Sequence, residues 1–147
     1  MTEARLSTPD DAEAAFYSAF AGTDLGAMAQ VWHTGDEARC IHPGGDLLIG
    51  TGAVLASWRQ IFAGAAAPTV RHRLLHRAGA GDLSVHLVEE RIGPQDADSD
   101  DLTRVLATNV YRRTNDGWRM VLHHATLPLV EPPQHPAEPT SAGGRLH

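Results

Sequence analysis

The spacing of apolar residues changes once along the chain. Before Thr69 they recur every three or four positions, as on one face of a helix, and from Thr69 onward they alternate with polar residues, as in a strand. Helices followed by consecutive strands indicate an α+β domain, in which helices cover one face of a mostly antiparallel sheet. We expect a single domain over residues 1–127, because a chain of 147 residues is too short for two ordinary domains.

Three helices and one short strand are predicted in the first half of the chain. The candidate N-terminal caps of the helices are Thr8, Asp24 and Thr51. Glycines mark where the first and third helices are expected to end, at Gly22 and near Gly64. The short strand covers residues 38–42 and runs into a Pro-Gly-Gly turn.

Four strands are expected in the second half, at residues 69–77, 83–92, 102–113 and 118–126. Asp116 and Gly117 join the last two in a hairpin, since glycine tolerates the positive φ that such turns demand. Side chains alternate along a strand, so His123 and His124 face opposite sides of the sheet. If Trp118 packs inward, strict alternation places His124 inside and His123 outside, toward a partner subunit.

Composition excludes several classes of function. A protein with a net charge of −6 does not attract phosphates electrostatically, so nucleic acid is not an expected partner. Cys40 is the only cysteine, which rules out an intrachain disulfide and fits a reducing compartment. Since no apolar stretch approaches the ~20 residues that cross a bilayer, we expect a cytoplasmic protein without membrane contact. The proline-rich residues 128–147 are expected to form an extended or disordered tail.

Two histidine-containing motifs carry a resemblance to a known family. The first is the segment HPGG at residues 42–45, and the second pairs ATNVY at residues 107–111 with GWRMVLHHA at residues 117–125. Together with three helices ahead of a long sheet, these motifs resemble the SnoaL-like branch of the nuclear transport factor 2-like (ketosteroid isomerase-like) superfamily. The resemblance covers roughly residues 7–127.

The resemblance implies a cone-shaped fold, in which a strongly curved, mostly antiparallel sheet wraps around the three N-terminal helices and leaves a pocket at the open end. It also implies homodimers that pair through the outer face of the sheet. The superfamily includes ketosteroid isomerases, polyketide cyclases, scytalone dehydratase and limonene epoxide hydrolase, and also members that only bind or assemble. The fold therefore decides no chemistry by itself.

The first candidate catalytic residue is His42, directly before a proline. Ketosteroid isomerases, which this region resembles, place a catalytic aspartate at the matching position. An imidazole there can act as an acid or base because its ordinary pKa lies close to neutral pH. The alternative is that His42 only holds the following turn by hydrogen bonding.

Glu90 is the second candidate, near the end of the second long strand, residues 83–92. Family members carry an acid at the end of this strand, which favours Glu90 over Glu89 as the inward carboxylate. This choice also turns His86 inward in place of the more regularly apolar Val85 and Leu87. A carboxylate beside an imidazole in an apolar cavity is suited to moving a proton. The alternative is a solvated carboxylate at the sheet edge.

His124 is the third candidate, unless it is a core histidine held by a backbone carbonyl. The candidate substrate-binding residues are Trp32, Trp58, Phe62, Asn109, Tyr111 and Trp118. Aromatic residues at helical spacing are typical of a core, and in a cone they also form the apolar wall of a pocket. Asn109 carries an amide that needs a partner if it is buried.

One position departs from the isomerases. The oxyanion-binding tyrosine of their first helix corresponds to Phe16, while Tyr17 lies about 100° further round the helix. An enolate stabiliser of that kind is therefore not expected, which argues against steroid isomerisation.

Three functions remain open. One is acid/base catalysis, of the cyclase, isomerase, dehydratase or epoxide hydrolase type, on a small apolar carbonyl-bearing or polycyclic compound. The others are ligand binding without turnover and dimeric assembly. We expect no cofactor, and no metal because no close-spaced pair of ligands such as HxH or HExxH occurs.

Overall fold

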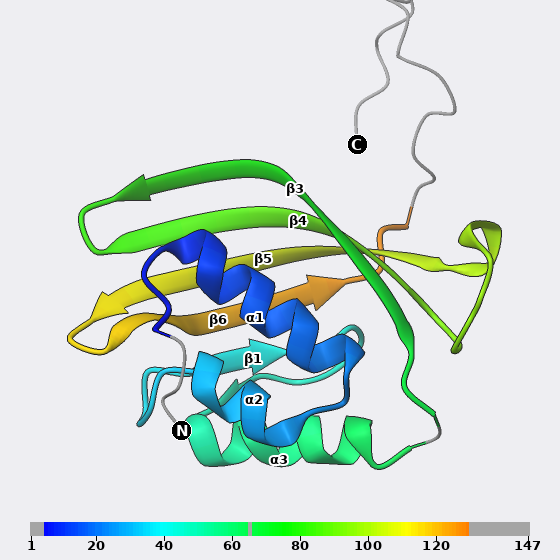
Figure 1. The fold of residues 1–147 in the computed structure, drawn as a ribbon, viewed down its shortest axis with the longest axis horizontal. Coiled ribbons are helices and arrows are strands. Elements are labelled where there is room, and N and C mark those ends of the chain that lie inside the picture. Colours follow the sequence, from blue (N-terminus) through cyan, green and yellow to red (C-terminus); the bar gives the residue numbers. More distant parts are fainter. Residues whose placement is uncertain (1–4, 65, 130–147) are drawn as a thin grey trace, which may run out of the picture.

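Three helices pack against one six-stranded sheet in the computed structural model, which describes residues 5–64 and 66–129 (Figure 1). The α+β class predicted from the sequence is confirmed. Of the expected tail, Pro128 and Leu129 are described, and residues 130–147 lie outside the described residues. No helix in the described part of the chain is long and apolar enough to cross a membrane.

The helices are α1 (Pro9–Ala21), α2 (Leu25–Val31) and α3 (Thr51–Phe62). Two of the predicted caps are present. The Thr8 hydroxyl accepts a hydrogen bond from the Asp11 backbone N–H at 3.0 Å, and Asp11 accepts one in return from the Thr8 N–H at 3.2 Å. Asp24 accepts from the Ala27 N–H at 3.0 Å.

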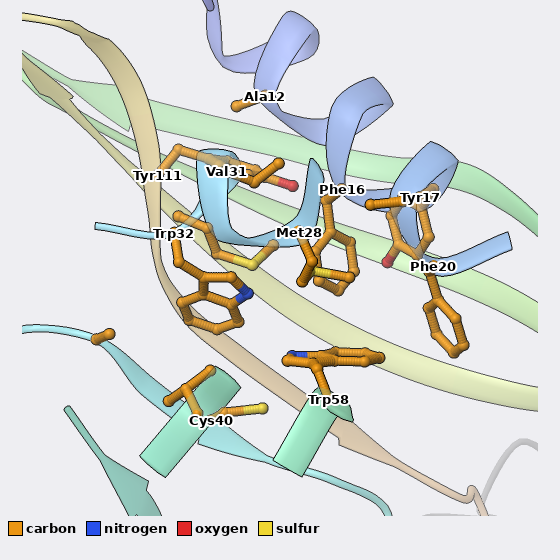
Figure 2. Packing of buried hydrophobic residues seen from close by; sticks show 14 of the residues in the cluster. Ala12, Phe16, Tyr17, Phe20, Met28, Val31, Trp32, Cys40, Trp58 and Tyr111 are labelled. Carbon is orange, nitrogen blue, oxygen red and sulfur yellow. The ribbon is translucent and has the colours of Figure 1, made fainter. Parts of the chain in front are cut away.

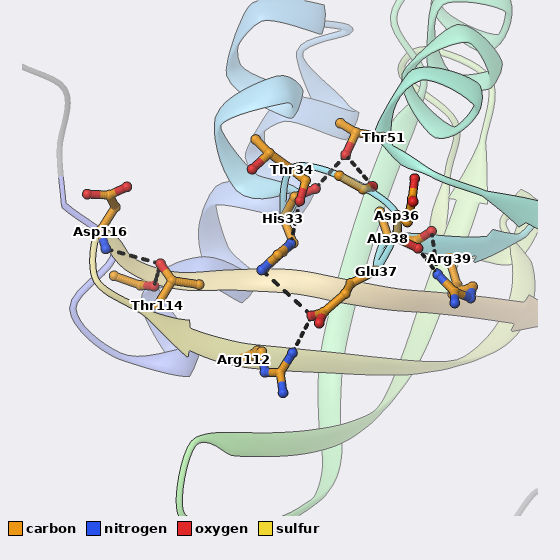
Figure 3. Close-up of polar contacts among 12 residues, drawn as sticks. His33, Thr34, Asp36, Glu37, Ala38, Arg39, Thr51, Arg112, Thr114 and Asp116 are labelled. Atoms are coloured by element: carbon orange, nitrogen blue, oxygen red, sulfur yellow. Dashed lines mark hydrogen bonds and ion pairs between the residues drawn. The ribbon is translucent and has the colours of Figure 1, made fainter.

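The third predicted cap is wrong. Thr51 is the first residue inside α3, and Gly50 is the cap, with a φ of 94° that favours glycine. The Thr51 hydroxyl instead donates to the backbone oxygen of His33 at 2.7 Å, and it lies within 3.1 Å of that of Gly35 (Figure 3). These bonds fix the start of α3 to the segment that leads into the first strand.

A second polar contact ties the same segment to the sheet. Glu37 accepts a hydrogen bond from Arg112 in the long hairpin and lies 3.7 Å from the His33 ring (Figure 3). Both side chains of the Glu37–Arg112 pair are largely exposed, so the contact orients the loop more than it stabilises the fold.

The sheet has the strand order β2-β1-β6-β5-β4-β3. The strands are β1 (Arg39–Ile41), β2 (Leu48–Ile49), β3 (Thr69–Ala80), β4 (Leu83–Gly93), β5 (Thr103–Thr114) and β6 (Gly117–Thr126). Among these six strands, β1 and β6 form the parallel pair and all other neighbours are antiparallel. β2 has two residues and was not predicted; a short 3₁₀ turn, Ser99–Asp101, precedes β5.

The hairpin of β5 and β6 has the predicted turn. Thr114 pairs with Gly117 around Asn115 and Asp116. Gly117 has a φ of 110°, and a Cβ atom there would lie 2.7 Å from the Leu6 carbonyl oxygen. Glycine is required both by the backbone conformation and by this close approach.

A bulge in β6 reverses the facing predicted for the two histidines. Val110 pairs with Leu122 but the next residue, Tyr111, pairs with Met120, so Val121 is an extra residue. Met120 and His123 are therefore both buried, whereas His124 is exposed. The expectation that His124 lines the interior is wrong, because alternation holds only within an uninterrupted ladder.

The sheet curves around α1, which lies across the face of β3 to β6, while α3 lies near β1 and β2 and α2 packs between α1 and α3 (Figure 1). We call the face that α1 covers the inner face. In the core, Phe16 contacts Trp32 and Trp58, with ring centroids 6.4 and 5.5 Å apart (Figure 2). The helices thus close the hollow of the sheet with aromatic side chains.

Candidate functional site

A row of side chains crosses the inner face of four strands. His86, Asn109, His123 and Cys40 lie in register on β4, β5, β6 and β1. All four are at most 1% exposed. Because buried polar groups need hydrogen-bond partners, the row requires further polar side chains from α1 and α3.

Tyr17 on α1 supplies the first of these partners. Its hydroxyl lies 2.5 Å from Oε2 of Glu90, which points inward from β4 and is 1% exposed. Nδ2 of Asn109 donates to the same hydroxyl oxygen at 2.9 Å. The tyrosine hydrogen is therefore directed at the carboxyl group.

Asn109 connects this pair to His123. Its Oδ1 lies 2.6 Å from His123 Nδ1, so that ring nitrogen carries the hydrogen. The donors then run in one direction, from His123 through Asn109 and Tyr17 to Glu90. His123 Nε2, on the other side of the ring, lies 3.9 Å from Glu90 Oε2, which is too long for a direct hydrogen bond.

Burial sets the ionisation of this network. Burial raises the pKa of Glu90 to about 7; the Tyr17 hydrogen bond lowers it and the charge of Glu13 raises it. Burial lowers the pKa of His123 to about 3, with further lowering from His42 and His124. Near neutral pH, His123 is uncharged and Glu90 exists in both forms.

A second buried pair lies one turn earlier on α1. Glu13 Oε1 is 2.8 Å from His86 Nδ1 and accepts a hydrogen bond from the Tyr111 hydroxyl at 3.3 Å. His86 Nε2 lies 3.0 Å from the Ser84 hydroxyl. The inward facing of both Glu90 and His86 follows from regular alternation on β4.

His42 lies at the end of β1, between α3 and the network. Its Nε2 is 2.9 Å from the Ser57 hydroxyl on α3 and 3.6 Å from the Cys40 sulfur. The His42 ring is 6.4 Å from that of His123 between centroids. Burial lowers the pKa of His42, so this imidazole is also uncharged at neutral pH.

Aromatic rings surround the two histidines. Trp58 packs edge-on against His42, with centroids 4.9 Å apart, and lies 5.7 Å from Phe62 and 5.0 Å from Phe20. Its indole nitrogen is buried and has no hydrogen-bond partner among the described residues. An apolar wall with a few polar groups is the composition typical of a small-molecule site.

The structure brings some of the predicted residues together and separates others. His42, Glu90, Asn109, Trp58 and Phe62 form one continuous cluster with His123 and Tyr17. Their roles in a reaction remain predictions. The described residues include no group of three histidine, cysteine, aspartate or glutamate side chains placed to hold a metal ion.

The remaining candidates lie elsewhere. His124 is on the outer face, paired in register with Thr108. Trp118 is five residues before His123, at the hairpin end of β6, and Tyr111 belongs to the Glu13 pair. Trp32 is buried in the core and bridges to Met120.

Sequence reasoning did not assign roles to Tyr17, Glu13 or Ser57. Phe16 and Tyr17 are both buried, because α1 packs on the sheet on one side and on α2 and α3 on the other. The signal available was the spacing of Glu13 and Tyr17, which puts two polar residues one turn apart on the same helix face. No comparable signal marks Ser57.

Comparison with known proteins gives one family match and several similar chains. A family model described as a SnoaL-like domain matches residues 10–130. Among curated proteins, F-box protein SKIP8 of Arabidopsis thaliana is 30% identical over 124 residues, which cover 81% of this chain. The match spans 49% of that relative, about half its length.

Two solved structures are similar over nearly their whole length. One, from Thiobacillus denitrificans, is named for a calcium/calmodulin-dependent protein kinase type II association domain; it is 40% identical with a TM-score of 0.80, over 86% of this chain and 99% of that one. The other, from Streptomyces avermitilis, is named as a dehydratase of the NTF2-like family; it is 33% identical with a TM-score of 0.70, over 84% and 100%.

Proposed function

Because this chain belongs to the SnoaL-like domain family of the nuclear transport factor 2-like superfamily, we propose that it performs acid/base chemistry on a small molecule at the Glu90 cluster. The proposed substrate is a small apolar compound that bears a carbonyl group or several rings. The reaction type is that of an isomerase, cyclase, dehydratase or epoxide hydrolase that works without a cofactor. The fold is known for small-molecule binding and for enzymes of these kinds.

The observation that carries the proposal is the state of Glu90. A carboxyl group with a pKa of about 7 takes a proton and returns it at neutral pH with little cost in either direction. The Tyr17 hydroxyl, whose own pKa burial raises well above its ordinary value, stays protonated and donates to the carboxylate. The pair thus resembles a tuned acid and base more than a structural contact.

The neighbouring imidazoles supply the second proton site. His42 is uncharged and its ring lies 6.4 Å from that of His123, so it can take up a proton during the reaction, whereas His123, whose pKa is lowered to about 3, stays neutral at 3.9 Å from Glu90. We assign this role to His42, with His123 in the position on the inner face that was predicted for His124. Trp58 and Phe62 would hold the apolar body of the substrate.

The test compares two adjacent glutamates. Wild type, Glu90→Gln, His42→Ala and the control Glu89→Gln are assayed for turnover of ketones, epoxides and polyketide mimics. Glu89 faces outward and is paired with arginines, so its substitution leaves the site intact. We expect Glu90→Gln to lower kcat by about 10²- to 10⁴-fold, as for loss of a general acid or base, with the control unchanged. Equal turnover by the two glutamine variants would exclude the proposal.

A second candidate is an assembly domain. The similar structure from Thiobacillus denitrificans is named for an association domain, which favours this alternative. Under it, no compound in the panel is turned over and the protein forms a defined oligomer. Binding of a panel member without turnover would instead favour a ligand-binding module.

A further inference from the structure

We propose that the polar end of this site holds a hydroxyl group of an uncharged ligand, because the groups left free on His42 and His123 are hydrogen-bond acceptors. The inference rests on the proposed function in one respect, which is that both concern the same site. Its test measures binding and ring protonation, without turnover.

Ser57 determines the first acceptor. Its hydroxyl donates to the backbone oxygen of Val54 at 2.6 Å, so its oxygen has only acceptor capacity left for His42 Nε2 at 2.9 Å. His42 therefore carries its hydrogen on Nε2. The lone pair is on Nδ1, which the Cys40 sulfur approaches at 4.0 Å in a weak contact.

Asn109 determines the second acceptor. Its amide nitrogen donates to the Tyr17 hydroxyl, so the amide oxygen is the atom that faces His123 Nδ1, and this nitrogen carries the hydrogen. The lone pair of His123 is then on Nε2, at 3.9 Å from Glu90. Asn109 is thus a positioning residue, with its oxygen and its nitrogen both engaged by neighbouring side chains.

The charges around these lone pairs exclude an anionic ligand. Both imidazoles are neutral, Glu90 is neutral or negative, and the Cys40 thiol stays protonated because burial raises its pKa to about 12. A carboxylate or phosphate would meet two lone pairs and no cation among these four groups. An ether or a bare carbonyl has no hydrogen to give to either ring.

A hydroxyl group satisfies this arrangement. It donates its hydrogen to a ring nitrogen, and its oxygen accepts from a protonated Glu90 or from the buried indole N–H of Trp58, which has no partner in the described part of the chain. The rings of Trp58, Phe62 and Phe20 fit an apolar body attached to the hydroxyl. The ligand class is therefore an alcohol, enol or phenol with an apolar skeleton.

The binding test uses three probes of one shape: 4-tert-butylphenol, 4-tert-butylanisole and 4-tert-butylbenzoate. Calorimetric titration of the wild-type protein at neutral pH should give the tightest binding for the phenol. Binding of the anisole should be weaker by about tenfold or more, the cost of one unmade hydrogen bond to a buried group. The benzoate should not bind measurably. Equal binding of phenol and anisole, tighter binding of the benzoate, or no binding of any probe would overturn the inference.

The second measurement is independent of any ligand. Nitrogen-15 shifts of the histidine rings should show His123 protonated on Nδ1 and His42 on Nε2. Ser57→Ala should remove the preference at His42 and lower the phenol-to-anisole ratio, whereas the control Ser18→Ala, exposed on α1, should change neither. His123 protonated on Nε2 would overturn the inference, because the donor chain would then run the other way. Selective binding of the phenol over the anisole, with no turnover of any compound, would support this inference and exclude the catalytic proposal.

Discussion

Glu89 and Glu90 are neighbours on β4 with opposite environments. Glu89 faces outward, where Arg104 donates to it at 2.7 Å, and Arg73 and Arg91 lie within 3.5 Å. The Arg104 hydrogen bond lowers the pKa of Glu89, although burial opposes it. Glu90 faces inward, meets no arginine or lysine within residues 5–64 and 66–129, and has a pKa raised to about 7. The same side chain is thus an anion paired with arginines in one position and a group that titrates near neutrality in the next.

This difference predicts opposite effects of pH on stability. A glutamate whose pKa is raised by folding favours the folded state fully below its ordinary pKa of 4.5, and this contribution is lost as the pH rises to about 7. Relative to Glu90→Gln, the free energy of unfolding of the wild-type protein should therefore fall by up to about 3 kcal/mol between about pH 4 and about pH 8. Denaturant unfolding at several pH values measures it.

Glu89→Gln is the control for that experiment. The pKa of Glu89 is lowered, so its contribution is present above its ordinary pKa and is lost as the pH falls. Relative to this variant, the wild-type protein should gain stability as the pH rises through the ordinary range of a glutamate. The same sign for both variants would mean that Glu90 is not desolvated as described.

At the scale of the elements, the bulge in β6 decides which histidine belongs to the site. The extra residue Val121 leaves Met120 on the inner face and shifts His123, instead of His124, onto that face. Without the bulge, the register of the hairpin end would place Leu122 opposite Asn109 and His124 opposite Ala107, so the donor chain to Glu90 would not form. One irregular residue therefore sets the chemistry of the site.

The bulge predicts unequal effects of two adjacent alanine substitutions. His123→Ala removes a buried ring and leaves the Asn109 oxygen without its partner, so it should destabilise the fold by about 2–4 kcal/mol. His124→Ala should change stability by less than about 0.5 kcal/mol, since the side chain is exposed. Thermal and denaturant unfolding compare them directly. A larger effect at His124 would contradict the register of β6.

Local signals explain what could be predicted from the sequence. The Thr8 and Asp24 caps and the turn before Gly117 are read from a few adjacent residues, and each forms as expected. The bulge at Val121 has no such signal, because it arises from the pairing of β5 with β6. The direction of Tyr17 depends in the same way on how α1 packs between the sheet and the other helices. The network was therefore only partly predictable: its residues on β4 and β5 were found, and its partners on α1 and α3 were not.

At the scale of the whole molecule, one curved sheet separates two surfaces. The inner face carries the site, and the outer face carries leucines, among them Leu75 and Leu87, which are 44% and 40% exposed. A hollow of about 260 Å³ on the outer side is lined by these two and by Leu106, Thr108 and Thr126. Exposed apolar side chains gathered on one sheet face favour a protein partner there.

We expect this outer face to pair with a second copy of the chain. Leu87→Lys should convert a dimer to a monomer at micromolar concentration, because it places a charge in the apolar contact. Ile61→Lys, at a similarly exposed position on α3, is the matched control and should leave the dimer unchanged. Sedimentation velocity separates the two results. A wild-type monomer at this concentration would contradict the prediction.

The proposed chemistry depends most on the ionisation of one carboxyl group. Carbon-13 labelling of the glutamate side chains, with Glu90→Gln to assign the signal, allows Glu90 to be titrated by NMR in the folded protein. We predict a midpoint near pH 7, together with a His123 ring that stays neutral down to about pH 3. A Glu90 midpoint near its ordinary value of 4.5 would contradict the account, since the site would then hold a permanent anion at neutral pH in place of a group able to exchange a proton.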